Sequence, residues 1–220
     1  LILASVMGKD LAFENSELVA LGVVAVVNYI VLIGLAYLIP HVFKVNKARM
    51  GICRFMLAFG NVSFIGYPVC DAVFRSKAVF CASVLNIPFN LLVFTIGVSF
   101  INGGKAKSAF SPKLILSPCV IASLIAVVIA IARIKMPVPV GEWFHLLGDL
   151  TTPCALLIIG SSLSHIPVRD MFGNRFVYSM TLLRLIVLPL AVGAVLALMG
   201  INPFVSDVAV VLSAMPVATN

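Results

Sequence analysis

Charge is scarce in this sequence. Asp, Glu, Lys and Arg together make up 10% of the 220 residues, whereas a soluble domain has about 25%. Hydrophobic residues make up 62%, so the chain could not cover itself with polar surface in water. This composition excludes a soluble enzyme or nucleic-acid module. It predicts an all-α membrane protein, a polytopic helical bundle whose solvent is the lipid bilayer.

Motifs for metal binding and catalysis are also lacking. The five cysteines are scattered through apolar stretches without a C-x-x-C pair, so we expect small buried hydrophobes rather than a zinc site or a disulfide framework. The sequence contains no H-E-x-x-H, no G-x-S-x-G and no pair of carboxylates within an apolar run. We therefore expect no enzymatic activity, no cofactor, no bound metal and no nucleic-acid partner.

Long apolar runs separated by short polar or Pro- and Gly-containing stretches make up the rest of the sequence. A span takes about 20 residues, and we expect one transmembrane domain over residues 1–220 with approximate spans at 1–12 (partial), 18–40, 50–74 (broken), 78–101, 114–134, 143–166, 176–199 and 205–220 (partial, broken). The loop that follows the first full span defines one side of the membrane, and most of the 15 Lys and Arg residues lie on that side. An excess of basic residues is typical of the cytoplasmic side, so we expect this side to be cytoplasmic.

The two ends of the chain lie within apolar runs. The chain begins at Leu1 rather than at Met, and it ends at Asn220 inside an unfinished segment. We therefore expect a piece of a longer multi-pass protein of the cell membrane, the inner membrane in a bacterium.

One expected span is interrupted near its middle. Gly60 and Gly66 weaken a helix on either side of Asn61 and Ser63, and Pro68 lacks an amide hydrogen and disfavours helix at the residue before it. A broken backbone is tolerated in a membrane only where protein or a wet cavity surrounds it, so Asn61, Ser63, Gly66 and Pro68 are candidates for substrate binding. The alternative is a proline kink in which the Asn61 side chain bonds a neighbouring helix.

A second interruption favours the functional interpretation. Met215, Pro216 and Thr219 again place a proline and small polar residues inside an apolar run. By the charge pattern the two interrupted segments cross the membrane in opposite directions. This arrangement is typical of a transporter with inverted repeats and a site at the midplane, so these residues are also candidates for substrate binding.

Several motifs in these segments resemble one family. Residues 60–68 are similar to the G-N-x-x-F-x-G-x-P crossover of the auxin efflux carrier family of bacterial permeases, and residues 153–163 to its P-x-A-L-x-x-I-G-x-x-L span. Residues 184–189 are similar to its R-L-x-x-x-P span, and residues 214–218 to its second crossover.

The resemblance implies a fold and a class of substrate. The fold has ten spans in two inverted five-helix repeats, with broken helices four and nine crossed near the centre, as in bile acid sodium symporters and plant auxin carriers. This chain would be a fragment running from the end of the second span into the ninth. The implied substrate is a small organic anion, such as a malate- or malonate-like dicarboxylate or an auxin-like weak acid.

Two asparagines add to the candidate site. Asn86 and Asn90 are four residues apart and share a helix face, with Pro88 between them loosening the backbone. They would line a cavity beside the first interruption. A hydrogen bond between helices is an equal alternative, because Asn commonly joins helices within membranes.

Two charged residues within or near spans are candidate charge partners of a substrate. Arg184 lies inside an expected span, where it would attract an anion; the alternative is an arginine that reaches the interface or pairs with a neighbouring helix. Asp149 would carry a coupling proton or cation, or else cap the helix that begins near Thr152.

The leading hypothesis is a secondary active transporter that works by alternating access around the two crossed helices. A ligand sensor built on a transporter fold is the alternative, and an intramembrane enzyme is the third hypothesis. The coupling ion (H⁺ or Na⁺, if there is one) and a homodimeric state are left open by the sequence.

Overall fold

Helices dominate the computed structural model, which describes residues 2–7, 15–102, 118–132, 134, 137–165, 167 and 175–218. The first part contains α1 (Ile2–Val6), α2 (Asn15–Val42), α3 (Lys47–Ala58), η1 (Val62–Gly66), α4 (Tyr67–Phe74), α5 (Ser76–Leu85), α6 (Ile87–Leu92), η2 (Val93–Gly97) and α7 (Val98–Ile101). The second part contains α8 (Pro118–Ala132), α9 (Val138–Asp149), α10 (Thr151–Ser164), α12 (Arg175–Leu182), η4 (Leu183–Val187), α13 (Leu188–Leu198) and α14 (Pro203–Ser213).

Four helical stretches are long and apolar enough to cross a membrane. They are Glu17–Val42, Ser76–Ile101, Val138–Ser164 and Arg175–Leu198, with 24 to 27 residues each. At 1.5 Å per residue even the shortest is about 36 Å long, more than the roughly 30 Å of a bilayer's hydrocarbon core. The expected all-α membrane fold is confirmed over the described part of the chain. Shorter apolar helices include Val62–Phe74, Val120–Ala132 and Pro203–Ser213.

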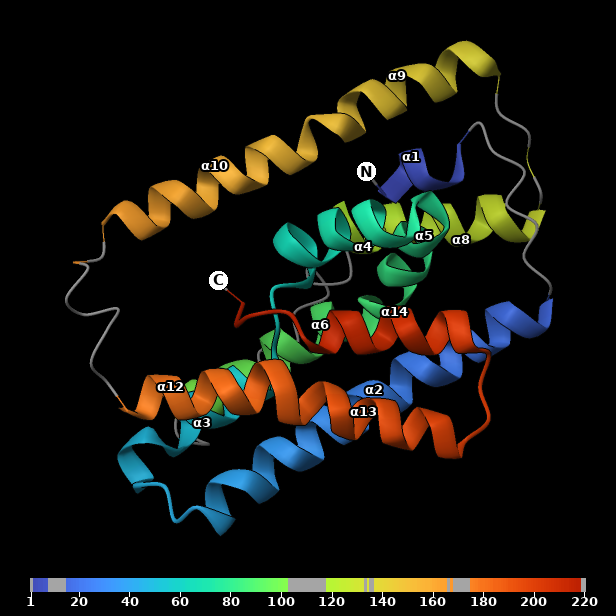
Figure 1. Cartoon of the computed structure of the whole chain (residues 1–220). Coiled ribbons are helices and arrows are strands. Elements are labelled where there is room, and N and C mark those ends of the chain that lie inside the picture. The colour runs from blue at the N-terminus through green and yellow to red at the C-terminus, as the bar shows by residue number, and fades with distance from the viewer. Residues whose placement is uncertain are drawn as a thin grey trace.

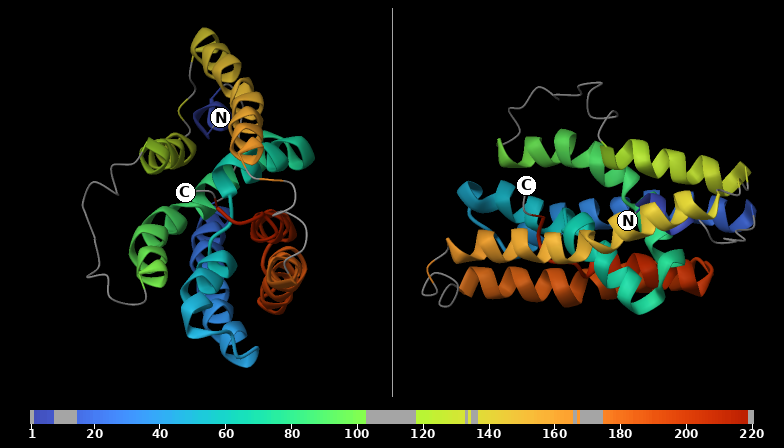
Figure 2. Two further views of the ribbon diagram at one scale, coloured as in Figure 1. Left: turned by 90° about the vertical axis from the view of Figure 1, so that its left-hand side faces the viewer. Right: turned by 90° about the horizontal axis from the view of Figure 1, so that it is seen from above.

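The helices run roughly parallel to one another and form a bundle around α2 and α14 (Figures 1 and 2). The α14 helix packs against α2, α5 and α13, and α2 also packs against α3. Their facing side chains form the core, in which Leu21, Leu57, Phe80, Leu188 and Val208 are fully buried. Two helices far apart in sequence, α3 and α14, are thereby brought to the same region.

The α9 and α10 helices lie at the edge of this bundle (Figure 1). They contact α1 and η1, while most of their large apolar side chains stay exposed, as suits a lipid-facing helix. Cys154 on α10 is exposed as well, so the expectation of a buried thiol is wrong there, because its side chain lies on a face of α10 that the described part of the chain leaves uncovered. Cys53, Cys70 and Cys81 are buried and free.

Within the described part of the chain, π-helical turns occur at η1, η2 and η4. The π-helix is rare and is found mainly as single turns inside α-helices, frequently at functional sites. η1 contains Ser63 and η4 contains Arg184, two of the residues that the sequence singles out. These local distortions therefore coincide with the region where the interrupted segments meet.

The contact between α3 and α7 depends on a residue without a side chain. A Cβ atom at Gly51 would lie 1.9 Å from the carbonyl oxygen of Phe100, which is a backbone atom and cannot swing aside. Gly51 therefore sets how closely the first half of the broken helix approaches the neighbouring span.

We expect Gly51→Ala to destabilise the full-length protein by about 1–3 kcal/mol, the usual cost of overpacking. Gly22→Ala is the matched control, because a Cβ atom there meets no atom within 4 Å. Alanine also favours helix over glycine by about 1 kcal/mol, so the control should be as stable as the wild type or more stable. Thermal unfolding in detergent measures both; equal melting temperatures for the two variants would contradict the close approach.

Candidate functional site

The first interruption lies at Phe59–Asn61. The α3 helix ends at Ala58, Phe59 is extended, and Asn61 leads into η1. The Asn61 side chain caps the second half-helix, because its Oδ1 accepts a hydrogen bond of 3.2 Å from the amide of Phe64. The helix therefore breaks at the Gly60–Asn61 pair, and its second half begins with an asparagine cap.

Pro68 does not break the helix, which differs from the expectation. Tyr67, the residue before it, has helical dihedral angles, and α4 continues directly from η1. A proline inside an α-helix lacks one hydrogen bond and clashes with the carbonyl four residues earlier. The wider π turn that precedes Pro68 provides room for the ring, so the chain stays helical there.

The second interruption pairs with the first. The α14 helix ends at Ser213, and the chain beyond it forms an isolated antiparallel bridge between Val217 and Gly60. The amide of Asn61 donates to the carbonyl of Pro216 at 2.7 Å, and the amide of Ala218 donates to the carbonyl of Phe59 at 3.1 Å. We call these paired segments, residues 59–61 and 215–218, the crossing. Each segment thus provides hydrogen-bond partners for backbone groups that lost their helical partners at the break in the other segment. Thr219 lies outside the described residues.

Arg184 lies against the crossing. Its side chain is 2% exposed, and its Nε donates a hydrogen bond of 3.0 Å to the carbonyl of Met215. Its Nη1 donates a second hydrogen bond to the carbonyl of Leu57, in the last turn of α3. The guanidinium group therefore joins the carboxyl-terminal ends of both interrupted helices, and it does not reach an interface.

A polar cluster lies beside the crossing. It consists of Ser63, Tyr67 and Asn86, and it joins η1 and α4 to the turn between α5 and α6. The Nδ2 of Asn86 donates to the Tyr67 hydroxyl at 3.0 Å and to the Ser63 Oγ at 3.3 Å. Asn86 is 1% exposed, and its Oδ1 is buried without a hydrogen-bond partner among the residues that the structure describes. A buried acceptor without a partner is costly and calls for an explanation, such as a bound ligand.

Asn90 and Gly66 support this arrangement from behind. The Nδ2 of Asn90 donates to the backbone carbonyl of Asn86 at 3.0 Å, so the turn at Pro88 is stabilised within its own helix. A Cβ atom at Gly66 would lie 2.9 Å from a methyl carbon of Leu212, so Gly66 lets α14 approach η1 closely.

Two buried polar residues were missed by the sequence reasoning. Tyr67 was treated only as the residue before Pro68, yet its hydroxyl accepts the hydrogen bond from Asn86. Asn28 on α2 is 4% exposed, and its Oδ1 is buried without a partner. The available signal was that Asn28 is the one amide side chain in the apolar run 18–40.

Asp149 lies elsewhere. It lines a polar cavity of about 320 Å³ between α1, α4, α5 and α9, together with Asp71, Arg75 and His145. The structure thus separates the two candidate charge partners, since Arg184 is bonded to the crossing and is not among the residues that line this cavity. The following helix, α10, begins at Thr151. Leu150 occupies its amino-terminal cap position and makes no side-chain hydrogen bond to the helix.

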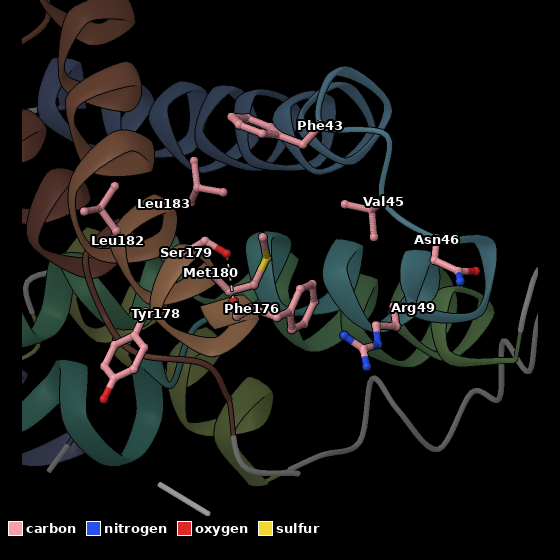
Figure 3. Close-up of a pocket in the computed structure, with 10 residues that line it drawn as sticks. All are labelled: Phe43, Val45, Asn46, Arg49, Phe176, Tyr178, Ser179, Met180, Leu182 and Leu183. Atoms are coloured by element: carbon pink, nitrogen blue, oxygen red, sulfur yellow. Dashed lines mark hydrogen bonds between the residues drawn. The ribbon is translucent and has the colours of Figure 1, made fainter. Parts of the chain in front are cut away.

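A larger cavity of about 760 Å³ lies between the α2–α3 connection and α12 (Figure 3). Most of its lining is apolar, including Phe43, Val45, Phe176 and Leu183, and Arg49 lies at one end with its guanidinium 5.5 Å from the centre of the Phe176 ring. A small polar solute is held by convergent polar groups. The crossing and the polar cluster provide such groups, so we take them as the candidate site.

We expect Tyr67→Phe to lower the free energy of unfolding of the full-length protein by about 1 kcal/mol, because the buried Nδ2 of Asn86 would lose an acceptor. Tyr178→Phe is the control, since that side chain is 52% exposed. Thermal unfolding measures both. Equal stability of Tyr67→Phe and Tyr178→Phe would show that the hydroxyl of Tyr67 does not stabilise the cluster.

Comparison with known proteins gives the family. A family model described as "Membrane transport protein" matches residues 106–220. The uncharacterized transporter MJ1031 of Methanocaldococcus jannaschii is 28% identical over 191 residues, which cover 84% of this chain and 61% of the relative. The uncharacterized transporter YfdV of Escherichia coli K12 is 23% identical over 158 residues, which cover 68% of this chain and 49% of the relative.

The chain thus spans between about half and about three fifths of the length of these curated relatives. No solved structure matches the chain at a significant level. The family model covers the second interrupted segment, and the alignment with MJ1031 extends over most of the chain. The chain belongs to the membrane transport protein family, which is the auxin efflux carrier family that its motifs resemble.

Proposed function

We propose that the full-length protein is a secondary active transporter of a small organic anion, with its binding site at the crossing and the polar cluster. The observation that carries the proposal is the pairing of the two interrupted helices by the Gly60–Val217 bridge, beside a buried amide with an open acceptor. Discontinuous helices that meet within a membrane are the usual place of substrate sites in secondary transporters. The proposal includes no cofactor.

The packing of the helices supports alternating access. The α14 helix packs with α2, α5 and α13, and α3 packs with α2 and α7, whereas α1 contacts α8 and α9, and α9 contacts α10. The two groups meet where α1 and α8 contact α5 and where α10 contacts η1. Ser63 lies in η1 and Asn86 directly follows α5, so the polar cluster lies next to the boundary between the two groups of helices. A movement of one group against the other would therefore open the cluster to either side in turn.

The chemistry of the site supports a weak organic acid. The second half-helix begins at η1, and the helix dipole gives its amino-terminal end a partial positive charge, which favours a carboxylate nearby. The hydrogen-bonding partners of Asn86 in the cluster, Ser63 and Tyr67, are neutral, so they do not repel an anion. The open Oδ1 of Asn86 would accept a hydrogen bond from a hydroxyl or a protonated carboxyl group of the substrate. A malate- or malonate-like dicarboxylate and an auxin-like weak acid both fit these requirements.

The test is uptake of radiolabelled malate, malonate and indole-3-acetate into proteoliposomes that contain the full-length protein. We expect Asn86→Ala to reduce uptake of the preferred acid about tenfold, the effect of losing one hydrogen bond of about 1.4 kcal/mol. Asn61→Ala should impair uptake as well, because it removes the cap of the half-helix that faces the substrate. Both variants should be expressed at normal levels.

Two further variants sharpen this test. Asn86→Asp should reduce uptake more than Asn86→Ala, because a carboxylate repels an anion; higher uptake by Asn86→Asp would indicate a cationic substrate instead. Ser162→Ala is the control, since Ser162 is exposed on α10 and its hydroxyl bonds only to the carbonyl of Ile158 in its own helix. Uptake by Asn86→Ala and Asn61→Ala at the level of Ser162→Ala would exclude the crossing as the binding site.

A further inference from the structure

We infer that Arg184 is a built-in cation of the crossing, which occupies the position where a coupling Na⁺ would otherwise neutralise the helix ends, so that transport proceeds without Na⁺. This inference rests on the proposed transport function and concerns its energy source. It is drawn from the hydrogen bonds of Arg184, from its burial and from the space left at Gly60.

The crossing brings two negative helix ends together. The α3 helix ends at Ala58 and the α14 helix ends at Ser213, and the chain segments that follow them are paired. A helix carries about half a negative elementary charge at its carboxyl-terminal end, in the form of carbonyl groups without a helical partner. Two such ends in an apolar interior require a positive group. In secondary transporters with broken helices this group is commonly a Na⁺ ion held by the freed carbonyls.

Arg184 supplies that positive group from within the chain. Its Nη1 donates to the carbonyl of Leu57 at the end of α3, and its Nε donates to the carbonyl of Met215 just after the end of α14. One planar group with donors pointing in different directions can bond both helix ends at once. With 2% of its surface exposed, the side chain also fills the space beside these carbonyls.

Gly60 provides the room that the guanidinium group needs. A Cβ atom at Gly60 would lie 2.1 Å from Nη2 of Arg184 and 3.1 Å from its Cζ. The φ angle of Gly60 is not positive, so glycine is needed at this position because it lacks a side chain and not because of an unusual backbone conformation. The position of Arg184 is therefore supported from two sides, by the carbonyls that it bonds and by the glycine that it packs against.

The same contacts argue against Arg184 as the group that binds the substrate. One positive charge bonded to two half-negative helix ends leaves little net charge to attract an anion. The recognition of the substrate then depends on the polar cluster and the positive amino-terminal end of η1, which is the assignment made above.

The first arm of the test compares cations with the wild-type full-length protein. Thermal unfolding in detergent and uptake in proteoliposomes are measured in NaCl, KCl and choline chloride at equal concentration. We expect the melting temperature and the rate of uptake to be the same in all three salts. A specific increase of the melting temperature by Na⁺, or a loss of uptake of about tenfold when choline replaces Na⁺, would overturn the inference.

The second arm removes the built-in cation. Arg184→Ala should have a lower melting temperature than the wild type, and methylguanidinium should raise it in this variant while lowering or not changing it in the wild type. Arg184→Lys, which keeps a positive charge, should lose less stability than Arg184→Ala and should remain independent of Na⁺. Wild-type stability of Arg184→Ala in choline chloride would overturn the inference.

The third arm displaces the guanidinium group without removing it. Gly60→Ala should lower the melting temperature and lower uptake, whereas Gly34→Ala on α2 is the control because a Cβ atom there meets nothing within 4 Å. Equal stability and uptake of the two variants would contradict the position assigned to Arg184.

Failure of the inference and failure of the proposed function give different results. If Arg184→Ala does not fold, the wild-type salt comparison, Arg184→Lys and Gly60→Ala still decide on the inference. If the wild type takes up none of the acids, the proposed function is wrong, while the melting temperatures still decide whether Arg184 replaces Na⁺.

Discussion

The structure depends on the satisfaction of backbone groups at two helix breaks within an apolar bundle. A helix that crosses a membrane pairs its own amides and carbonyls, and a break leaves some of them without partners in a medium that offers no water. Here the amide of Asn61 and the carbonyl of Phe59 are paired with the chain after α14, and the carbonyls of Leu57 and Met215 are bonded by Arg184. Each break is tolerated because the other lies beside it.

This mutual dependence also explains the small residues around the crossing. Gly60 makes room for the guanidinium group and Gly66 lets α14 approach η1, while Gly51, two turns earlier in α3, lets that helix approach α7. Larger side chains would push the helices apart, and the backbone donor–acceptor distances of about 3 Å at the crossing would then become too long for hydrogen bonds. The glycines therefore act through the spacing of helices, whereas the asparagines act through hydrogen bonds. The geometry of the crossing is therefore sensitive to small shifts of either helix.

The sequence predicted the features that depend on local chemistry and missed those that depend on distant partners. Hydropathy and length predict the long helices, and glycine, proline and asparagine together mark both interruptions. The position of the first break was predicted less well. Pro68 was expected to disfavour helix at Tyr67, but a π turn that the sequence pattern does not predict accommodates its ring. The hydrogen bonds of Arg184 to Leu57 and Met215, 127 and 31 residues away, could not be predicted, since hydrophobic patterning does not say which helix ends meet.

Asn28 and Arg184 together bear on the proposed repeat. Each lies in the long span before an interrupted segment, α2 or α12–α13, and at nearly the same sequence distance from the bridge residue of that segment, Gly60 or Val217. Each is buried and polar in an otherwise apolar helix.

An inverted repeat would place these two positions on opposite sides of the crossing. One of them carries a charge and the other an amide, which is what the electrostatics require: two half-negative helix ends are neutralised by one cation, and a second would leave an uncompensated charge in the membrane. An inverted arrangement of the backbone is thus compatible with two different side chains at these positions.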